Sequence, residues 1–181
     1  KGAPQIMMMS LETGRILPFL SPRATMSSLP EFTRDGRLVF ASTAAGSPMQ
    51  LFSSGLDGTG LRRITNSRSI DVEPKVNPKT GADVVFVSGR SGPQQIYLMS
   101  MDGGEATRLT TGEGQASNPS WHPDGQHIAF AWTKGYDPGN FNIFIMDVAT
   151  RQVVQLTHGA GRNENPSWAP DGRHLVFSSD R

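Results

Sequence analysis

The sequence repeats with a period of 45 to 47 residues, and this period constrains the fold more than any other feature. Four landmarks keep their phase through four copies: an amide before an apolar run, an apolar residue before a hydroxyl, a Pro-x-aromatic or Pro-x-apolar triplet, and a phenylalanine. They stand at Gln5, Gln50, Gln95 and Asn142; at Leu20-Ser21, Ile64-Thr65, Leu109-Thr110 and Leu156-Thr157; at 30–32, 74–76, 119–121 and 166–168; and at Phe40, Phe86, Phe130 and Phe177. Landmarks that stay in phase indicate a structural repeat.

Each unit contains four short strand patterns joined by turns. After the proline triplet comes a turn with glycine, as in Pro123-Asp124-Gly125, where proline presets φ and glycine accepts a positive φ. Two apolar strands follow, such as those at 127–130 and 143–146, and then a last strand at 153–157. Four strands in a meander, repeated at this spacing, are typical of a β-propeller blade.

One such meander has two partly apolar faces and cannot bury both of them alone, so the units must stack. We therefore predict an all-β propeller of four-stranded antiparallel blades, occupying residues 1–181 as a single domain or fragment. The predicted whole blades span 30–65, 74–110 and 119–157, and half-blades span 5–21 and 166–181. We expect the aromatic landmarks Phe32, Trp121 and Trp168 to pack between blades.

The two predicted half-blades are complementary in sequence. If Arg181 is joined to Lys1, the combined text resembles the stretch from Ser88 to Ile96. Two interpretations follow: the halves pair and close a small ring, or the chain is a central piece of a larger, six-bladed propeller. We favour the second, and the exposed end blades then offer a surface for oligomerisation.

Composition excludes several kinds of function. The net charge is +1 with no basic stripe, there is no cysteine, and no apolar run approaches the ~18 residues of a membrane helix. We therefore expect no nucleic-acid partner, no disulfide and no membrane insertion. No histidine pair has zinc spacing and no Gly-x-Ser-x-Gly motif occurs, so we expect no catalytic residues, no metal and no cofactor.

Polar residues precede each proline triplet, at Asp71 and Glu73, Ser117 and Asn118, and Glu164 and Asn165. Because the first strand of a blade is the innermost, these side chains should line one mouth of the central channel. One interpretation is a partner-binding mouth, and the other is solvated channel lining. A calcium ion held by Asp71, Glu73 and Glu164 is a further alternative, since calcium prefers oxygen ligands.

The connections between second and third strands should open on the same face as that mouth. The longest spans 132–141, and an exposed Trp132 or Tyr136 there would anchor a partner. The alternative is that Trp132 covers the edge of its own blade. Arg90 and Arg162 could add forked contacts to carboxylates or carbonyls.

The run from Asn165 to Arg181 resembles the repeat of the TolB-type propellers, as does Pro93–Met99 with the following Asp102-Gly103-Gly104 turn. The resemblance implies a six-bladed periplasmic propeller behind an amino-terminal α/β domain. It also implies a role in the Tol–Pal system, which links the outer membrane to the cell wall during division. The implied partner is the peptidoglycan-associated lipoprotein, bound by the propeller.

Two other classes of function remain open at this point. Peptidases of the prolyl-oligopeptidase and tricorn types carry similar propellers, which gate access to a catalytic domain. Sugar-binding or lyase propellers with a metal in the channel are the other class. Flanking sequence would identify the first class, and metal analysis would identify the second.

Overall fold

The structure is a computed structural model that describes residues 3–19, 26–159 and 161–181. Within these residues the chain is all β, with sixteen strands in five antiparallel sheets and no helix. This confirms the predicted all-β propeller architecture.

Three sheets have four strands each, in meander order. They are β3–β6 (Ser27–Phe32, Leu38–Ser42, Gln50–Ser54, Arg62–Arg63), β7–β10 (Asp71–Val76, Asp83–Ser88, Gln95–Ser100, Thr107–Arg108) and β11–β14 (Ala116–Trp121, His127–Trp132, Asn142–Asp147, Val153–Gln155). Two hairpins complete the described chain, β1–β2 (Met7–Met9, Ile16–Pro18) and β15–β16 (Asn163–Trp168, Leu175–Ser179). Each first strand begins three residues before the proline that opens its sequence unit.

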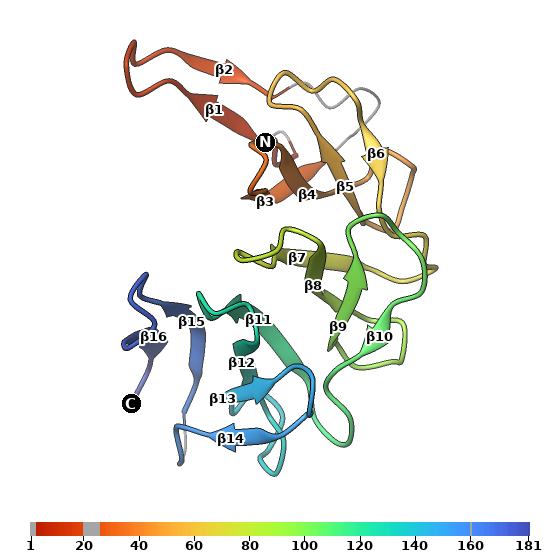
Figure 1. The fold of residues 1–181 in the computed structure, drawn as a ribbon. Helices are drawn as coiled ribbons and strands as arrows, with labels where there is room; N and C mark the ends of the chain where they lie inside the picture. The colour runs from red at the N-terminus through yellow and green to blue at the C-terminus, as the bar shows by residue number, and fades with distance from the viewer. Residues whose placement is uncertain (1–2, 20–25, 160) are drawn as a thin grey trace.

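The five sheets follow one another along an arc, with the two hairpins at its extremities (Figure 1). The first strands β3, β7, β11 and β15 are consecutive neighbours along this arc. They form its inner wall, whereas the short strands β6, β10 and β14 lie at the outer edge of their sheets (Figure 1). Among the described residues, β1–β2 and β15–β16 remain two separate two-stranded sheets.

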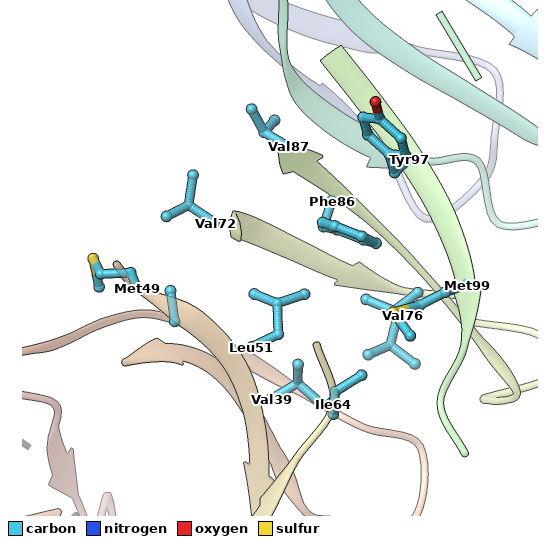
Figure 2. Close-up of a cluster of buried hydrophobic side chains, with 12 residues drawn as sticks. Val39, Met49, Leu51, Ile64, Val72, Val76, Phe86, Val87, Tyr97 and Met99 are labelled. Atoms are coloured by element: carbon cyan, nitrogen blue, oxygen red, sulfur yellow. The ribbon is translucent and has the colours of Figure 1, made fainter. Parts of the chain in front are cut away.

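The hydrophobic core lies between the sheets, because successive side chains of a strand point to opposite faces. In β4, Val39 and Ala41 pack toward β7–β10, while Leu38 and Phe40 pack toward the β1–β2 side. Figure 2 shows the first of these clusters, in which Leu51 of β5 lies near Val76 of β7 and Met99 of β9. A second cluster joins the β7–β10 sheet to β11–β14. Each central strand is therefore covered on both faces.

The aromatic landmarks do not all pack in the same way. Trp121 is 8% exposed and its indole N–H donates to the carbonyl of Lys75 in the neighbouring sheet, at 2.8 Å. Trp168 is half-buried and meets the ring of His122 edge-on, with ring centroids 4.6 Å apart. The expectation that Phe32 packs between blades is wrong, because this residue is 66% exposed. Phe32 ends β3, and the core on that side is supplied by Leu38, Phe40 and Phe52.

Two of the sequence landmarks bond to each other inside each blade. The hydroxyl of Thr110 accepts the N–H of Ile96 at 2.9 Å and donates to Oε1 of Gln95 at 2.6 Å. Thr65 makes the same two bonds with residues 51 and 50, and Thr157 with residues 143 and 142. We call this arrangement the amide–hydroxyl clasp. It attaches the outer strand to the third strand, and its equivalent at Leu20-Ser21 lies outside the described residues.

Candidate functional site

Every inner strand is interrupted at the residue before its proline. The register shifts between residues 28 and 31, 72 and 75, 117 and 120, and 164 and 167. The residue before each proline has a positive φ: 56° at Leu29, 53° at Glu73, 52° at Asn118 and 55° at Asn165. Such backbone is strained for any residue but glycine, and asparagine tolerates it best. Proline has no N–H to donate to the hydrogen bonds between strands, so a strand tolerates proline at a bulge.

The side chains of the four bulge residues, Leu29, Glu73, Asn118 and Asn165, lie on the concave inner side of the arc. They line a cavity of about 460 Å³, together with the four prolines and with Lys75, Ser120 and Ser167. All four inner strands contribute to this wall. We refer to this surface, which the residues named above form, as the channel wall.

Hydrogen bonds connect the channel wall from blade to blade. The Glu73 carboxylate accepts the backbone N–H of Asn118 at 2.7 Å, and Oδ1 of Asn118 accepts the N–H of Asn165 at 3.4 Å. Burial raises the pKa of Glu73 above its ordinary value, although the bonds from Asn118 and the charge of Lys75 oppose this rise. Lys75 itself pairs with Glu31 at 2.8 Å. The structure thus brings together the predicted residues Glu73, Asn118 and Asn165.

Asp71 forms an ion pair with Arg90 instead of lining the mouth of the channel. Asp71 is completely buried and lies 3.0 Å from Nη2 of Arg90, while the Ser67 hydroxyl donates to it at 2.8 Å. The Arg90 guanidinium also lies 4.8 Å from the ring centre of Tyr97. The expectation that Asp71 lines the mouth is therefore wrong. Nor does Asp71 gather with Glu73 and Glu164 into a cation site within the part of the chain that the structure describes.

Trp132 is also a structural residue. It ends β12, is 2% exposed, and its ring lies 5.7 Å from that of Phe130 and 5.4 Å from that of Phe144. Lys134 covers it, with Nζ 4.8 Å from the ring centre. The expectation of an exposed anchor is wrong, because the last position of β12 faces the blade interior, and the alternative that Trp132 covers its own blade is the one observed.

The remaining predicted residues lie at accessible positions. The half-buried Tyr136 accepts a bond from the Gln155 amide at 2.9 Å and lines a second cavity of about 920 Å³ between the loops at 113–115 and 133–140. Arg162 and Glu164 pair at 3.2 Å, and the Arg162 side chain is 59% exposed. Glu164 directly precedes the bulge residue Asn165, and its pair with Arg162 forms a charged edge beside the channel wall.

Sequence reasoning missed one cluster. His122, Asp124 and His127 lie around the turn between β11 and β12, with one nitrogen or oxygen of each within 4.8 Å of the others. The pattern His-Pro-Asp-x-x-His was the available signal, because a tight turn returns its first and last residues to the same place. Its spacing differs from that of common zinc motifs, so the spacing by itself predicts no metal site.

Comparison with known proteins supports the fold and the repeat. A family profile described as the TolB beta propeller domain matches residues 1–135 and 111–181. The chain is 45% identical over 60 residues to the Tol-Pal system protein TolB of Bordetella pertussis, covering 33% of this chain and 13% of that protein. An uncharacterized protein of Agrobacterium fabrum is 33% identical over 112 residues, covering 56% of this chain and 38% of that protein. The chain therefore spans well under half the length of these curated relatives.

Solved structures agree with this match. TolB from Acinetobacter baumannii superposes with a TM-score of 0.77 and 27% identity, over 95% of this chain and 42% of that one. A puromycin-hydrolyzing peptidase of Mycobacterium tuberculosis superposes with a TM-score of 0.72 over 93% of this chain and 28% of that one. Its 14% identity shows a shared fold alone. The described residues contain no helix long and apolar enough to cross a membrane.

Proposed function

The chain belongs to the TolB β-propeller family, and we propose that it is a protein-binding module that holds its partner at the channel wall. The partner that fits the family is the peptidoglycan-associated lipoprotein, and the compartment is the periplasm. The role would then be that of the TolB component of the Tol–Pal system, in envelope integrity and cell division. The proposal includes no catalytic activity.

The observation that carries the proposal is the strained bulge, which recurs at the same position in all four inner strands. Backbone strain that persists at equivalent positions is typical of binding surfaces, where the surrounding structure enforces it. Here it presents a concave wall of prolines with a few polar groups. Such a combination suits recognition, since apolar area supplies affinity and the polar groups fix orientation.

The proposed contacts follow from the charges. Glu73 is a carboxylate with unfilled acceptor capacity beside Asn118, so it would receive a donor or a cation from the partner. Asn165 and the Arg162–Glu164 pair would supply contacts at the edge of the wall. Tyr136 would add an amphipathic contact on the loop side. Asp71, Arg90 and Trp132 would act indirectly, by holding their blades rigid.

Isothermal titration calorimetry with the peptidoglycan-associated lipoprotein, lacking its lipid, would test the proposal. Two informative variants are Glu73→Gln and Asn118→Gly, because glycine keeps the positive φ while removing the amide. We expect each to weaken binding by about tenfold, equivalent to about 1.4 kcal/mol. Glu105→Gln, on an exposed residue of the outer side, is the matched control and should bind normally. An absence of binding by the unmodified protein would overturn the proposal.

The alternative of a substrate-gating peptidase propeller rests on the shared fold. Fluorogenic peptide substrates would distinguish the two proposals, with the gene sequence on both sides of residues 1–181 as a second criterion. A Ser–Asp–His hydrolase domain encoded downstream would favour the peptidase. A lipoprotein complex that forms without peptidase activity would favour the binding module.

A further inference from the structure

The turn between β11 and β12 gathers three metal-ligating side chains around a single oxygen. Oδ2 of Asp124 lies 3.0 Å from Nδ1 of His122 and 2.7 Å from Nδ1 of His127. Ligands of one tetrahedral metal ion, each about 2.0–2.2 Å from it, stand about 3.3–3.6 Å apart, so the side chains would have to separate by less than about 1 Å to admit an ion. The three side chains are 21% to 38% exposed, so an ion could reach them from solvent.

The tautomer of His122 is set by the neighbouring blade. Its Nε2 lies 3.0 Å from the carbonyl oxygen of Gly172, and a carbonyl can only accept. Nε2 must therefore carry the proton, which leaves a lone pair on Nδ1 in the neutral ring. That lone pair accepts the Asp124 N–H at 3.1 Å and lies 3.0 Å from Oδ2 of Asp124, so an ion bound here would take the place of this N–H. Two acceptors this close require a positive charge between them, either a proton or a metal ion.

The second histidine has a looser contact at its remote nitrogen. Nε2 of His127 lies 3.7 Å from Oδ2 of Asp147, which is close enough for charge attraction but not for a hydrogen bond. With the proton of His127 on Nε2, its Nδ1 becomes a free ligand directed at the same point. Metal-binding histidines almost always donate their remote N–H to a carbonyl or a carboxylate. His122 has such an acceptor in Gly172, whereas the carboxylate of Asp147 lies beyond hydrogen-bond distance from His127.

The backbone of the turn orients the Asp124 carboxylate. Its Oδ1 accepts the N–H of Gln126 at 2.7 Å and the N–H of His127 at 3.1 Å. Oδ2 is thereby left to face the two imidazoles.

We propose that His122, Asp124 and His127 form a binding site for a zinc-class transition-metal ion, with solvent completing its coordination. Two imidazole nitrogens and one carboxylate oxygen suit Zn²⁺, Ni²⁺ and Co²⁺, whereas Ca²⁺ and Mg²⁺ prefer all-oxygen sites. The site lies at the turn between the first two strands of its blade, four residues after the bulge residue Asn118 in sequence. Because His122 also bonds Gly172, the ion would brace the contact between the β11–β14 sheet and the β15–β16 hairpin.

The repeat supplies its own comparison. At the equivalent turn of the next unit, Asp171 and His174 pair at 3.2 Å, but Ala169 replaces the first histidine. At the preceding unit, Asn77 occupies the position of His122, and its amide donates to Gly125 at 3.0 Å as His122 does to Gly172. Asparagine can therefore keep the bond between blades without offering an imidazole.

The test is zinc titration of the complete chain by calorimetry, with metal analysis after gel filtration and Co²⁺ absorption as a spectroscopic probe of the ligands. We expect one bound zinc per chain. His122→Asn, Asp124→Asn and His127→Asn should each weaken binding by at least about tenfold. His122→Asn retains the Asn77-type bond, so its fold should persist, which circular dichroism would verify.

His174→Asn and Asp171→Asn are the matched controls, and they should leave zinc affinity unchanged. The proposal is overturned if the unmodified protein binds no zinc, or if His122→Asn binds as tightly as the unmodified protein. Equal losses in His127→Asn and His174→Asn would also overturn it, because they would indicate non-specific binding by surface imidazoles. Acid should release the ion, since the ligating imidazoles must be unprotonated.

Discussion

Replacing Thr110 by valine removes one amide–hydroxyl clasp while preserving the shape of the side chain. Thr110 is completely buried, and its hydroxyl accepts the Ile96 N–H at 2.9 Å and donates to Gln95 Oε1 at 2.6 Å. In Thr110→Val both partners stay buried. Gln95 keeps the bond from its Nε2 to the carbonyl of Gly114 at 2.7 Å, so its amide is not free to turn toward solvent.

The expected loss of stability follows from these two orphaned groups. A buried donor or acceptor without a partner costs about 1–3 kcal/mol. The two groups are neighbours and their penalties overlap, so we expect Thr110→Val to lower the free energy of unfolding by about 2–4 kcal/mol. At about 2–4 °C per kcal/mol for a domain of this size, the melting temperature should fall by about 4–16 °C.

Urea unfolding followed by tryptophan fluorescence measures this loss. The neighbouring Thr111 is exposed, so Thr111→Val is the matched control and should stay within about 0.5 kcal/mol of the unmodified protein. Thr157→Val removes the same two bonds at a site that is 9% exposed, and its loss should be smaller than that of Thr110→Val. If Thr110→Val and Thr111→Val were equally stable, the clasp would not contribute as we argue.

Three further predictions concern the channel wall, the turns and the core. Burial raises the pKa of Glu73 in the folded state, so the folded protein binds that proton more tightly than the unfolded chain does. The free energy of unfolding should therefore fall, relative to that of Glu73→Gln, as the pH rises from the ordinary value of 4.5 through the raised pKa. Paired urea curves at several pH values would show this. Gly125→Ala should destabilise more than Gly36→Ala in the same measurement, because both positions have positive φ but only at Gly125 would a Cβ meet the Asn77 side chain, at 2.5 Å. Trp132→Ala should lower the free energy of unfolding by about 3–5 kcal/mol, as expected for a core residue, and a folded variant of normal stability would contradict that role.

The period of the sequence by itself determined the fold class, the order of strands and the positions of the turns. These features are local: alternation of apolar residues specifies a strand, and Pro, Asp and Gly specify a turn at fixed offsets. The need to stack followed as well, because no unit can bury its own two faces. The set of polar residues before the prolines also followed, and Glu73, Asn118 and Asn165 do gather at one wall.

The tertiary structure alone decided what each of those polar and aromatic side chains does. Trp132 and Asp71 resemble exposed site residues in sequence, but one faces the blade interior and the other is neutralised by Arg90, which is 19 residues away. The positive φ of Leu29 and Glu73 has no signal in residue type, since it is imposed by the bulge. The bond from His122 to Gly172 spans 50 residues, so the state of that imidazole depends on a neighbouring unit. Local pattern specifies how a strand or turn forms, whereas burial and pairing depend on which residues of other blades arrive beside it.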